Sequence, residues 1–203
     1  MRTQTTKESY NGKPINTGER HKLPCYQEVL KRLEYVMSQA LSKHAKVLFF
    51  RLDLRFPVTF IAPQDNNYMM EFMKRYVEKL EYKKLSTHYL WVRERNTSLN
   101  HHYHLLMMLD GYKTMNAFKH VLLAQELWPQ VLKIEGLKKI DLKGLVQHCN
   151  QENACLMIHR NDKESINEAF FWGSYLAKVK TKEHDIPFRS MGSSRLNSNI
   201  TLI

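Results

Sequence analysis

Two histidines separated by one residue are the most informative candidates for chemistry in this chain. Residues 100–111 read NHHYHLLMMLDG, and the apolar run ended by Asp-Gly predicts a strand. Side chains alternate between the faces of a strand, so His102 and His104 share one face. His101 and Tyr103 face the other way. Two imidazoles placed in this way can bind one divalent ion. With ten histidines in 203 residues, the same pair could also simply line a solvated sheet face.

A third metal ligand is expected from the preceding strand. Residues 87–94 and 101–109 read as two strands joined by the polar loop 95–100, which favours an antiparallel pair. Glu94 would then lie near the hairpin end, close to His102. A carboxylate at this point suits Mg²⁺ or Mn²⁺, which favour oxygen ligands.

Tyr175 is the candidate nucleophile, in the sequence FFWGSYLAKVKTK of residues 170–182. A helix is predicted over 165–182, and a phenol one turn away from Lys178 suits phosphodiester transesterification. The lysine charge would stabilise negative charge that develops on the phosphate. Phe171 and Trp172 could stack on unpaired bases. Alternatively, the tyrosine packs beside these aromatic residues and the lysines are only a solvated face. Residues at helical spacing form two stripes: Ile166, Phe170, Gly173, Leu176 and Ala177 toward the core, and Phe171, Tyr175, Lys178 and Lys182 beside them.

Charge and composition narrow the class of partner. Lys and Arg number 31 against 20 Asp and Glu, a formal net charge of +11. This surplus favours a polyanion, with nucleic acid first and an anionic membrane surface second. The three cysteines show no CxxC spacing, which argues against a disulfide framework and favours a reducing cytoplasm. Residues 1–10 do not resemble a signal peptide, and the apolar runs are too short to span a bilayer.

The periodicity predicts an α+β fold. An N-terminal helix from Pro24 precedes the order β-α-β-β-α-β-β-α, which contains the βαββαβ plan of a ferredoxin-like sandwich. We expect residues 1–23 to form a flexible basic arm, 24–195 a single domain and 196–203 a tail, with 183–203 loosely structured. The predicted elements are a strand at 45–54, a helix at 66–85, strands at 87–94 and 101–109, a helix at 114–132, strands at 144–148 and 154–159, and a helix at 165–182.

These motifs, in this order, resemble the HUH endonucleases, which initiate rolling-circle replication, plasmid transfer and some transpositions. The chain is also similar, from about residue 11 to 195, to the YagK/YfjJ-like family of prophage and inovirus-type proteins linked with phage replication initiation. The similarity rests on FFRLDLRFP at 49–57, HYHLLMMLDG at 102–111, SYLAKVKTKE at 174–183 and GSSR at 192–195.

The resemblance implies a metal-dependent enzyme that nicks and rejoins single-stranded DNA at a replication origin through a covalent 5′-phosphotyrosine. His102 and His104 would bind Mg²⁺ or Mn²⁺. Glu94 would be the less secure third ligand, with Asp53, in the strand predicted at 45–54, as the second candidate for that position. Tyr175 would be the nucleophile and Lys178 its assisting cation. The chain has no Walker loop, so a host helicase would be needed. Neither a membrane nor a small-molecule substrate is expected. The alternative is a non-catalytic prophage DNA-binding or regulatory protein on the same fold.

Overall fold

The computed structural model describes residues 3–18, 23–95, 98–134, 144–148, 155–179, 188–195 and 201–203. Its centre is a six-stranded sheet in the order β10-β6-β7-β5-β8, with β9 also pairing with β5. Every pairing between these described strands is antiparallel. The predicted α+β class is therefore confirmed. The strands are β5 (Lys46–Arg55), β6 (His88–Glu94), β7 (His102–Asp110), β8 (Val146–His148), β9 (Leu156–His159) and β10 (Met191–Ser193).

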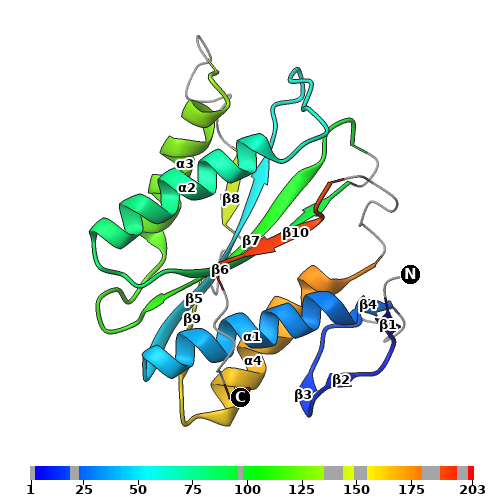
Figure 1. Cartoon of the computed structure of the whole chain (residues 1–203), viewed down its shortest axis with the longest axis vertical. Coiled ribbons are helices and arrows are strands. Elements are labelled where there is room, and N and C mark those ends of the chain that lie inside the picture. Colours follow the sequence, from blue (N-terminus) through cyan, green and yellow to red (C-terminus); the bar gives the residue numbers. More distant parts are fainter. Residues whose placement is uncertain are drawn as a thin grey trace.

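Four helices cover the two faces of this sheet (Figure 1). The apolar run of β5 explains why both faces are covered: Leu48, Phe50 and Leu52 pack with α2 and α3, whereas Val47 and Phe49 pack with α1 and α4. A strand that is buried on both faces needs apolar residues at successive positions. The helices are α1 (Gln27–Lys43), α2 (Asn67–Tyr82), α3 (Phe118–Val131) and α4 (Lys163–Ser174).

The strand register brings three strand ends together at one end of the sheet. β5 pairs with β7 over its whole length, from Val47 opposite Asp110 to Arg55 opposite His102. On the other side of β7, β6 pairs up to Glu94, which also lies opposite His102. The ends of β5 and β6 and the beginning of β7 are thus direct neighbours. The predicted strands at 45–54, 87–94 and 101–109 are all found within one or two residues of their expected ends.

The N-terminal residues 3–18 are packed, which corrects the predicted flexible arm. They contain the short strands β1 (Gln4–Thr5), β2 (Ser9–Tyr10) and β3 (Lys13–Pro14). Lys13 Nζ lies 2.8 Å from Glu34 Oε1 of α1, with both side chains buried, and Ile15 is also buried. Strands of only two residues are too short to show an alternating pattern of apolar residues. The two charged residues of a buried ion pair look like exposed residues in the sequence. The hydrophobic pattern therefore did not predict this packing. Residues 1–2 and 19–22 lie outside the described residues.

Several helix ends also differ from the prediction: α2 ends at Tyr82 instead of Leu85, and α3 begins at Phe118 instead of Thr114. The first helix begins at Gln27 instead of Pro24 because β4 (Cys25–Tyr26) pairs with β1. The last helix ends at Ser174 and continues as the 3₁₀ turn Tyr175–Ala177. Lys178 then forms an isolated β-bridge with Cys25 and leaves the helix direction. Lys182 and the rest of 180–187 lie outside the described residues.

The segment 191–193, predicted to be loosely structured, is the edge strand β10. It pairs with β6, and a Cβ on Gly192 would lie 2.6 Å from the Trp91 ring. Only glycine allows so close an approach between backbone and ring. An edge strand needs only backbone hydrogen bonds to one neighbour. Its Gly and Ser residues therefore show no alternation of apolar and polar side chains from which a strand could be predicted. Residues 196–200 of the predicted tail lie outside the described residues.

Among the described residues, no helix is long and apolar enough to cross a membrane.

Candidate metal and tyrosine site

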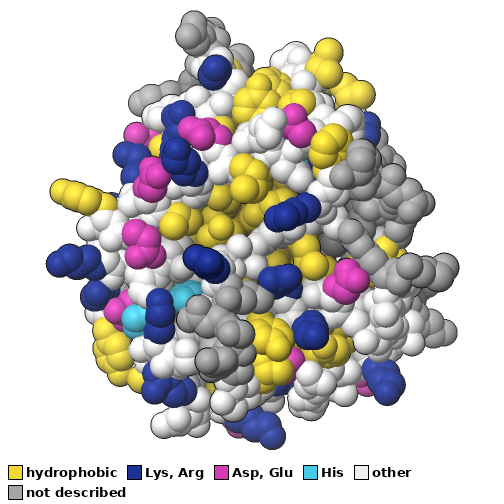
Figure 2. All heavy atoms as spheres, in the orientation of Figure 1, with side chains coloured by type: hydrophobic (Ala, Val, Ile, Leu, Met, Phe, Trp, Pro, Cys, Tyr) yellow, Lys and Arg dark blue, Asp and Glu magenta, His cyan; other side chains and the backbone are white. Residues whose placement is uncertain are grey.

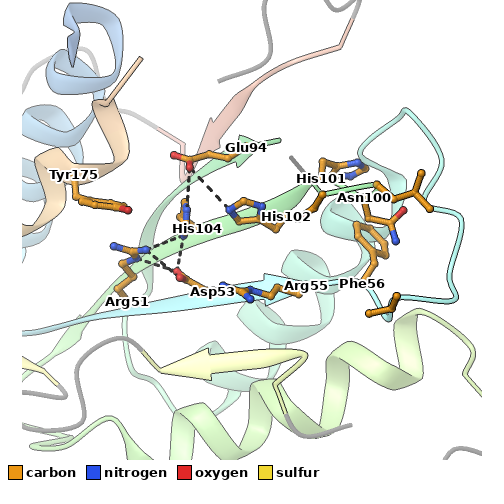
Figure 3. A pocket seen from close by; sticks show the side chains of 13 residues that line it. Arg51, Asp53, Arg55, Phe56, Glu94, Asn100, His101, His102, His104 and Tyr175 are labelled. Atoms are coloured by element: carbon orange, nitrogen blue, oxygen red, sulfur yellow. Dashed lines mark hydrogen bonds and ion pairs between the residues drawn. The ribbon is translucent and has the colours of Figure 1, made fainter. Parts of the chain in front are cut away.

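Three potential metal ligands meet at the hairpin end of β6 and β7 (Figure 3). Glu94 lies opposite His102 in the strand pairing, and His104 follows two residues later on the same face. Glu94 Oε2 is 3.1 Å from His104 Nε2 and 3.9 Å from His102 Nε2, and the ligand atoms of all three lie within 4.8 Å of one another. Ligand atoms around an ion with bonds of about 2.1 Å lie roughly 3.0–3.4 Å apart. The group could therefore bind a metal ion after small side-chain movements.

Asp53 orients one of these histidines from the neighbouring strand. It lies opposite His104 in the pairing of β5 with β7, and its Oδ1 accepts a hydrogen bond from His104 Nδ1 at 2.6 Å. Protonation of Nδ1 leaves the lone pair of Nε2 directed toward Glu94, which is how a carboxylate commonly prepares a metal-binding histidine. Arg51 Nη2 also approaches Nδ1, at 2.9 Å, but this nitrogen already donates its hydrogen to Asp53. We therefore assign no hydrogen bond to that pair.

Arg51 in turn fixes Asp53. Its Nε donates to Asp53 Oδ1 at 2.9 Å and its Nη2 donates to Oδ2 at 3.0 Å, a bidentate arrangement. Burial raises the pKa of Asp53, but the hydrogen bond from His104 and the charge and hydrogen bonds of Arg51 outweigh it and hold the pKa well below its usual range. Asp53 is thus an ionised carboxylate that supports His104 from the side opposite Glu94, and it is not one of the three potential ligands.

Burial keeps His102 in the form that can bind a metal. It lowers the pKa of His102 to about 4, and the neighbouring His104 acts in the same direction, against the opposing charges of Glu94 and Asp53. An imidazole with this pKa is neutral at physiological pH, which is the form that donates a lone pair to a cation.

Tyr175 lies beside the histidines because the residues before and after it are fixed. A Cβ on Gly173 would meet Leu33 of α1 at 2.9 Å, so this glycine lets α4 approach α1 closely. Ser174 is fully buried; its Oγ donates to Phe171 O and accepts from Asn16 N, both at 2.7 Å. The Tyr175 ring is 6.0 Å from the His104 ring, centroid to centroid, and nearly perpendicular to it. The structure thus brings together two motifs that are some seventy residues apart in the chain.

Two cations lie against the Tyr175 ring. Arg51 Cζ is 4.5 Å from the ring centroid and Lys178 Nζ is 4.2 Å from it, within the range of a cation–π contact. Burial lowers the pKa of Lys178 below its ordinary value, and the charge of Arg51 also lowers it. Lys178 reaches the ring from the β-bridge with Cys25, not from the helical turn that the sequence predicted.

Tyr175 forms part of the wall of two pockets. The larger pocket, of about 540 Å³, is lined by the three potential ligands and also by Arg55, Val58 and Leu99. The smaller one, of about 210 Å³, shares Arg51 and Tyr175 with the first. Its other lining residues are mostly apolar or aromatic: Asn16, Phe49, Leu106, Phe171 and Trp172.

The strand pairing confirms which face of the sheet was predicted for each of the three histidines. His102 and His104 share a face, with Glu94 opposite His102, while His101 lies on the other face and contacts Tyr103. The metal-binding and catalytic roles stay predictions. Sequence reasoning missed Arg51 and Arg55, although charges at alternate positions of an otherwise apolar strand were a usable signal.

Comparison with known families agrees with the resemblance noted from the motifs. The model of the YagK/YfjJ C-terminal domain matches residues 5–194, nearly the whole chain. The protein therefore belongs to the YagK/YfjJ family. Searches of curated proteins and of solved structures gave no significant match. The likeness to HUH endonucleases remains a prediction.

Proposed function

We propose that this protein is a phage or prophage replication initiator that cuts and rejoins single-stranded DNA, with Tyr175 as the nucleophile. The observation that carries the proposal is the position of the Tyr175 ring, 6.0 Å from the ring of His104 in the Glu94–His102–His104 cluster. The nucleophile and the candidate metal ligands line one pocket, as transesterification at a metal-bound phosphate requires.

The chemistry assigns a distinct task to each group. A divalent ion such as Mg²⁺ or Mn²⁺, held by Glu94, His102 and His104, would polarise and position the scissile phosphate. Tyr175 Oη attacks the phosphorus, the bond from phosphorus to the 3′ oxygen breaks, and the 5′ end of the DNA remains as a phosphotyrosine. The 3′ oxygen gains a proton, which balances the proton lost from Oη. The reverse reaction rejoins the strand.

The charged groups around Tyr175 support this reaction. Arg51 and Lys178 lie within 4.5 Å and 4.2 Å of the ring centroid, where positive charge stabilises the negative charge that develops during attack. Phe171 and Trp172 line the smaller pocket on the same tyrosine and are suited to stacking on unpaired bases. The net charge of +11 favours a polyanionic substrate.

The strand order supports the finer assignment of the fold. β5-α2-β6 and β7-α3-β8 are two βαβ units that interleave, with β7 between β5 and β6 and with β5 between β7 and β8. This interleaving supports the proposal that the domain has the ferredoxin-like plan of the HUH endonucleases. On this view α1 is an addition before the plan and α4 carries the tyrosine at its end.

The proposal is tested by comparing cleavage with binding. The protein is incubated with a pool of single-stranded DNA and Mn²⁺, while DNA binding is measured in parallel by fluorescence anisotropy. We expect the double variant His102→Ala/His104→Ala to bind DNA but not to nick it, and His159→Ala, at an exposed histidine of β9, to do both. A wild-type protein that binds DNA without metal and never nicks it would instead be the non-catalytic DNA-binding protein.

A further inference from the structure

A basic hollow lies along the edge strand β10, apart from the metal and tyrosine site. It measures about 470 Å³, and its lining contains Arg32 of α1 together with Arg189, Arg195 and three serines of the 189–195 segment. Among the described residues that line it there is no Asp or Glu. We call it the arginine groove. The GSSR sequence at 192–195, one of the family motifs, has no part in the proposed cleavage chemistry.

The strand register places this groove on the same face of the sheet as the cleavage site. Met191 lies opposite Val92 and Ser193 opposite Leu90, and Met191 packs in the core beneath α1. Alternation along the strand then puts residues 189 and 195 on that face as well. Ser190 O accepts a hydrogen bond from Arg93 N, so Arg189 is next to Glu94 across the pairing. The segment therefore leads away from the metal cluster over about 20 Å.

Both ends of the segment are held by side chains of neighbouring helices. Asn66, just before α2, donates from Nδ2 to Arg189 O at 2.8 Å, and Gln39 of α1 donates from Nε2 to Arg195 O at 3.0 Å. These bonds fix the backbone of the segment, while Arg189 and Arg195 are exposed and Arg32 is half-buried. No ion pair of Arg32, Arg189 or Arg195 occurs within the part of the chain that the structure describes. Arginines without acidic partners around a serine-rich hollow suit phosphate groups.

We propose that the arginine groove binds the sugar–phosphate backbone of the DNA strand that enters or leaves the cleavage site. A neighbouring pocket shares Arg32 and Met191 and is also lined by Glu28, Lys31 and Tyr35. The Tyr35 ring offers an aromatic surface for an unpaired base beside the backbone track. Figure 2 shows several Lys and Arg side chains on the surface over β10 and α1. The inference rests on the proposed function in taking single-stranded DNA as the substrate, but it does not require that Tyr175 cuts it.

The test measures the salt dependence of binding for the full chain. A single-stranded oligonucleotide of mixed sequence is titrated by anisotropy over a range of NaCl concentrations. Each lost phosphate contact flattens the slope of log K against log [salt] by about 0.7, so the variant Arg32→Gln/Arg189→Gln/Arg195→Gln should lose about 2 from its slope. The control Lys74→Gln/Lys79→Gln/Lys119→Gln removes the same charge from exposed positions on α2 and α3. It should keep the wild-type slope.

The outcomes separate this inference from the proposed function. Equal slopes for the groove variant and the wild type would overturn the inference, as would an equal loss in the groove variant and the control. Displacement of the oligonucleotide by inorganic phosphate beyond the effect of ionic strength would also overturn it, since the groove would then be a site for free phosphate. If the slope falls as expected but no covalent adduct forms, the groove stands and the cleavage proposal fails. If an adduct forms with an unchanged slope, cleavage stands and the groove fails.

Discussion

Replacing Asp53 with asparagine perturbs the support of one candidate metal ligand, His104, while leaving all three candidate ligands in place. Asp53 accepts the hydrogen bond from His104 Nδ1 at 2.6 Å and two from Arg51. An asparagine of the same size keeps one acceptor oxygen but loses the charge that holds the imidazole in its metal-binding tautomer. Removing such a partner typically weakens metal affinity by about 10- to 100-fold.

The loss can be measured as a smaller stabilisation by metal. At a Mn²⁺ concentration 100 times the wild-type Kd, binding stabilises the wild-type protein by about 2.7 kcal/mol. The same concentration would stabilise Asp53→Asn by about 1.4 kcal/mol for a tenfold loss, or about 0.4 kcal/mol for a hundredfold loss. For a chain of this size, 1 kcal/mol corresponds to roughly 2–4 °C in Tm, so the shift falls from about 5–11 °C to about 1–6 °C.

Thermal unfolding with and without Mn²⁺ is compared within each variant, so that changes in the stability of the metal-free protein cancel. His104→Ala, which removes a candidate ligand, should abolish the Mn²⁺-dependent shift, and Glu78→Gln, at an exposed carboxylate on α2, should leave it unchanged. If Asp53→Asn shows the wild-type shift, the supporting role of Asp53 is refuted. If it abolishes the shift as His104→Ala does, Asp53 is itself a ligand.

Three further predictions concern the parts of the fold that hold the site. Lys13→Ala should destabilise the protein by about 3–5 kcal/mol because it leaves the Glu34 carboxylate buried without its ion pair, while Lys13→Met/Glu34→Leu should recover much of this loss in chemical denaturation. Gly192→Ala should cost about 1–3 kcal/mol because its Cβ would meet the Trp91 ring, and amide exchange in β10 should become faster; slow exchange there would contradict the packing. Burial, with the charges of neighbouring cations, lowers the pKa of His88 to about 4, against about 6.5 in the unfolded chain, so the unfolded state binds the proton more readily. The contribution of neutral His88 to the free energy of unfolding is complete above pH 6.5, and about 3 kcal/mol is lost as the pH falls toward 4. The free energy of unfolding of His88→Leu should therefore fall less steeply with decreasing pH than that of the wild type. An equally steep fall in the variant would refute this.

The sequence predicted the parts of this structure that follow from periodicity. β5 and β7 bury long apolar runs, and their period of two places His102 and His104 on one face. Glu94 could be placed close to His102 because both residues lie at the loop end of one predicted hairpin. These are local properties of strands, so one sequence is sufficient to infer them.

Other parts depend on contacts between distant segments. The turn of the chain after Ser174, which directs Tyr175 toward His104, depends on the close packing of Gly173 against α1 and on the bonds of Ser174 to Phe171 and Asn16. These contacts join segments that are far apart in the chain, so the hydrophobic pattern within one segment cannot predict them. The same holds for β10, where backbone pairing with β6 suffices and the side chains are small or polar. The support of His104 by Arg51 and Asp53 could have been proposed from their alternation in an apolar strand, but only the register with β7 shows which histidine they face.

Mapping the covalent product is the most direct test of the central claim, that Tyr175 is the nucleophile of a DNA-cutting reaction. After reaction with single-stranded DNA and Mn²⁺, nuclease treatment and trypsin digestion, mass spectrometry should find a nucleotide phosphate on the peptide 164–178. Tyr175 is the one tyrosine in that peptide. We expect the modified peptide from the wild-type protein and no adduct from Tyr175→Phe. An adduct that persists in Tyr175→Phe, or that maps to another residue, would contradict the account.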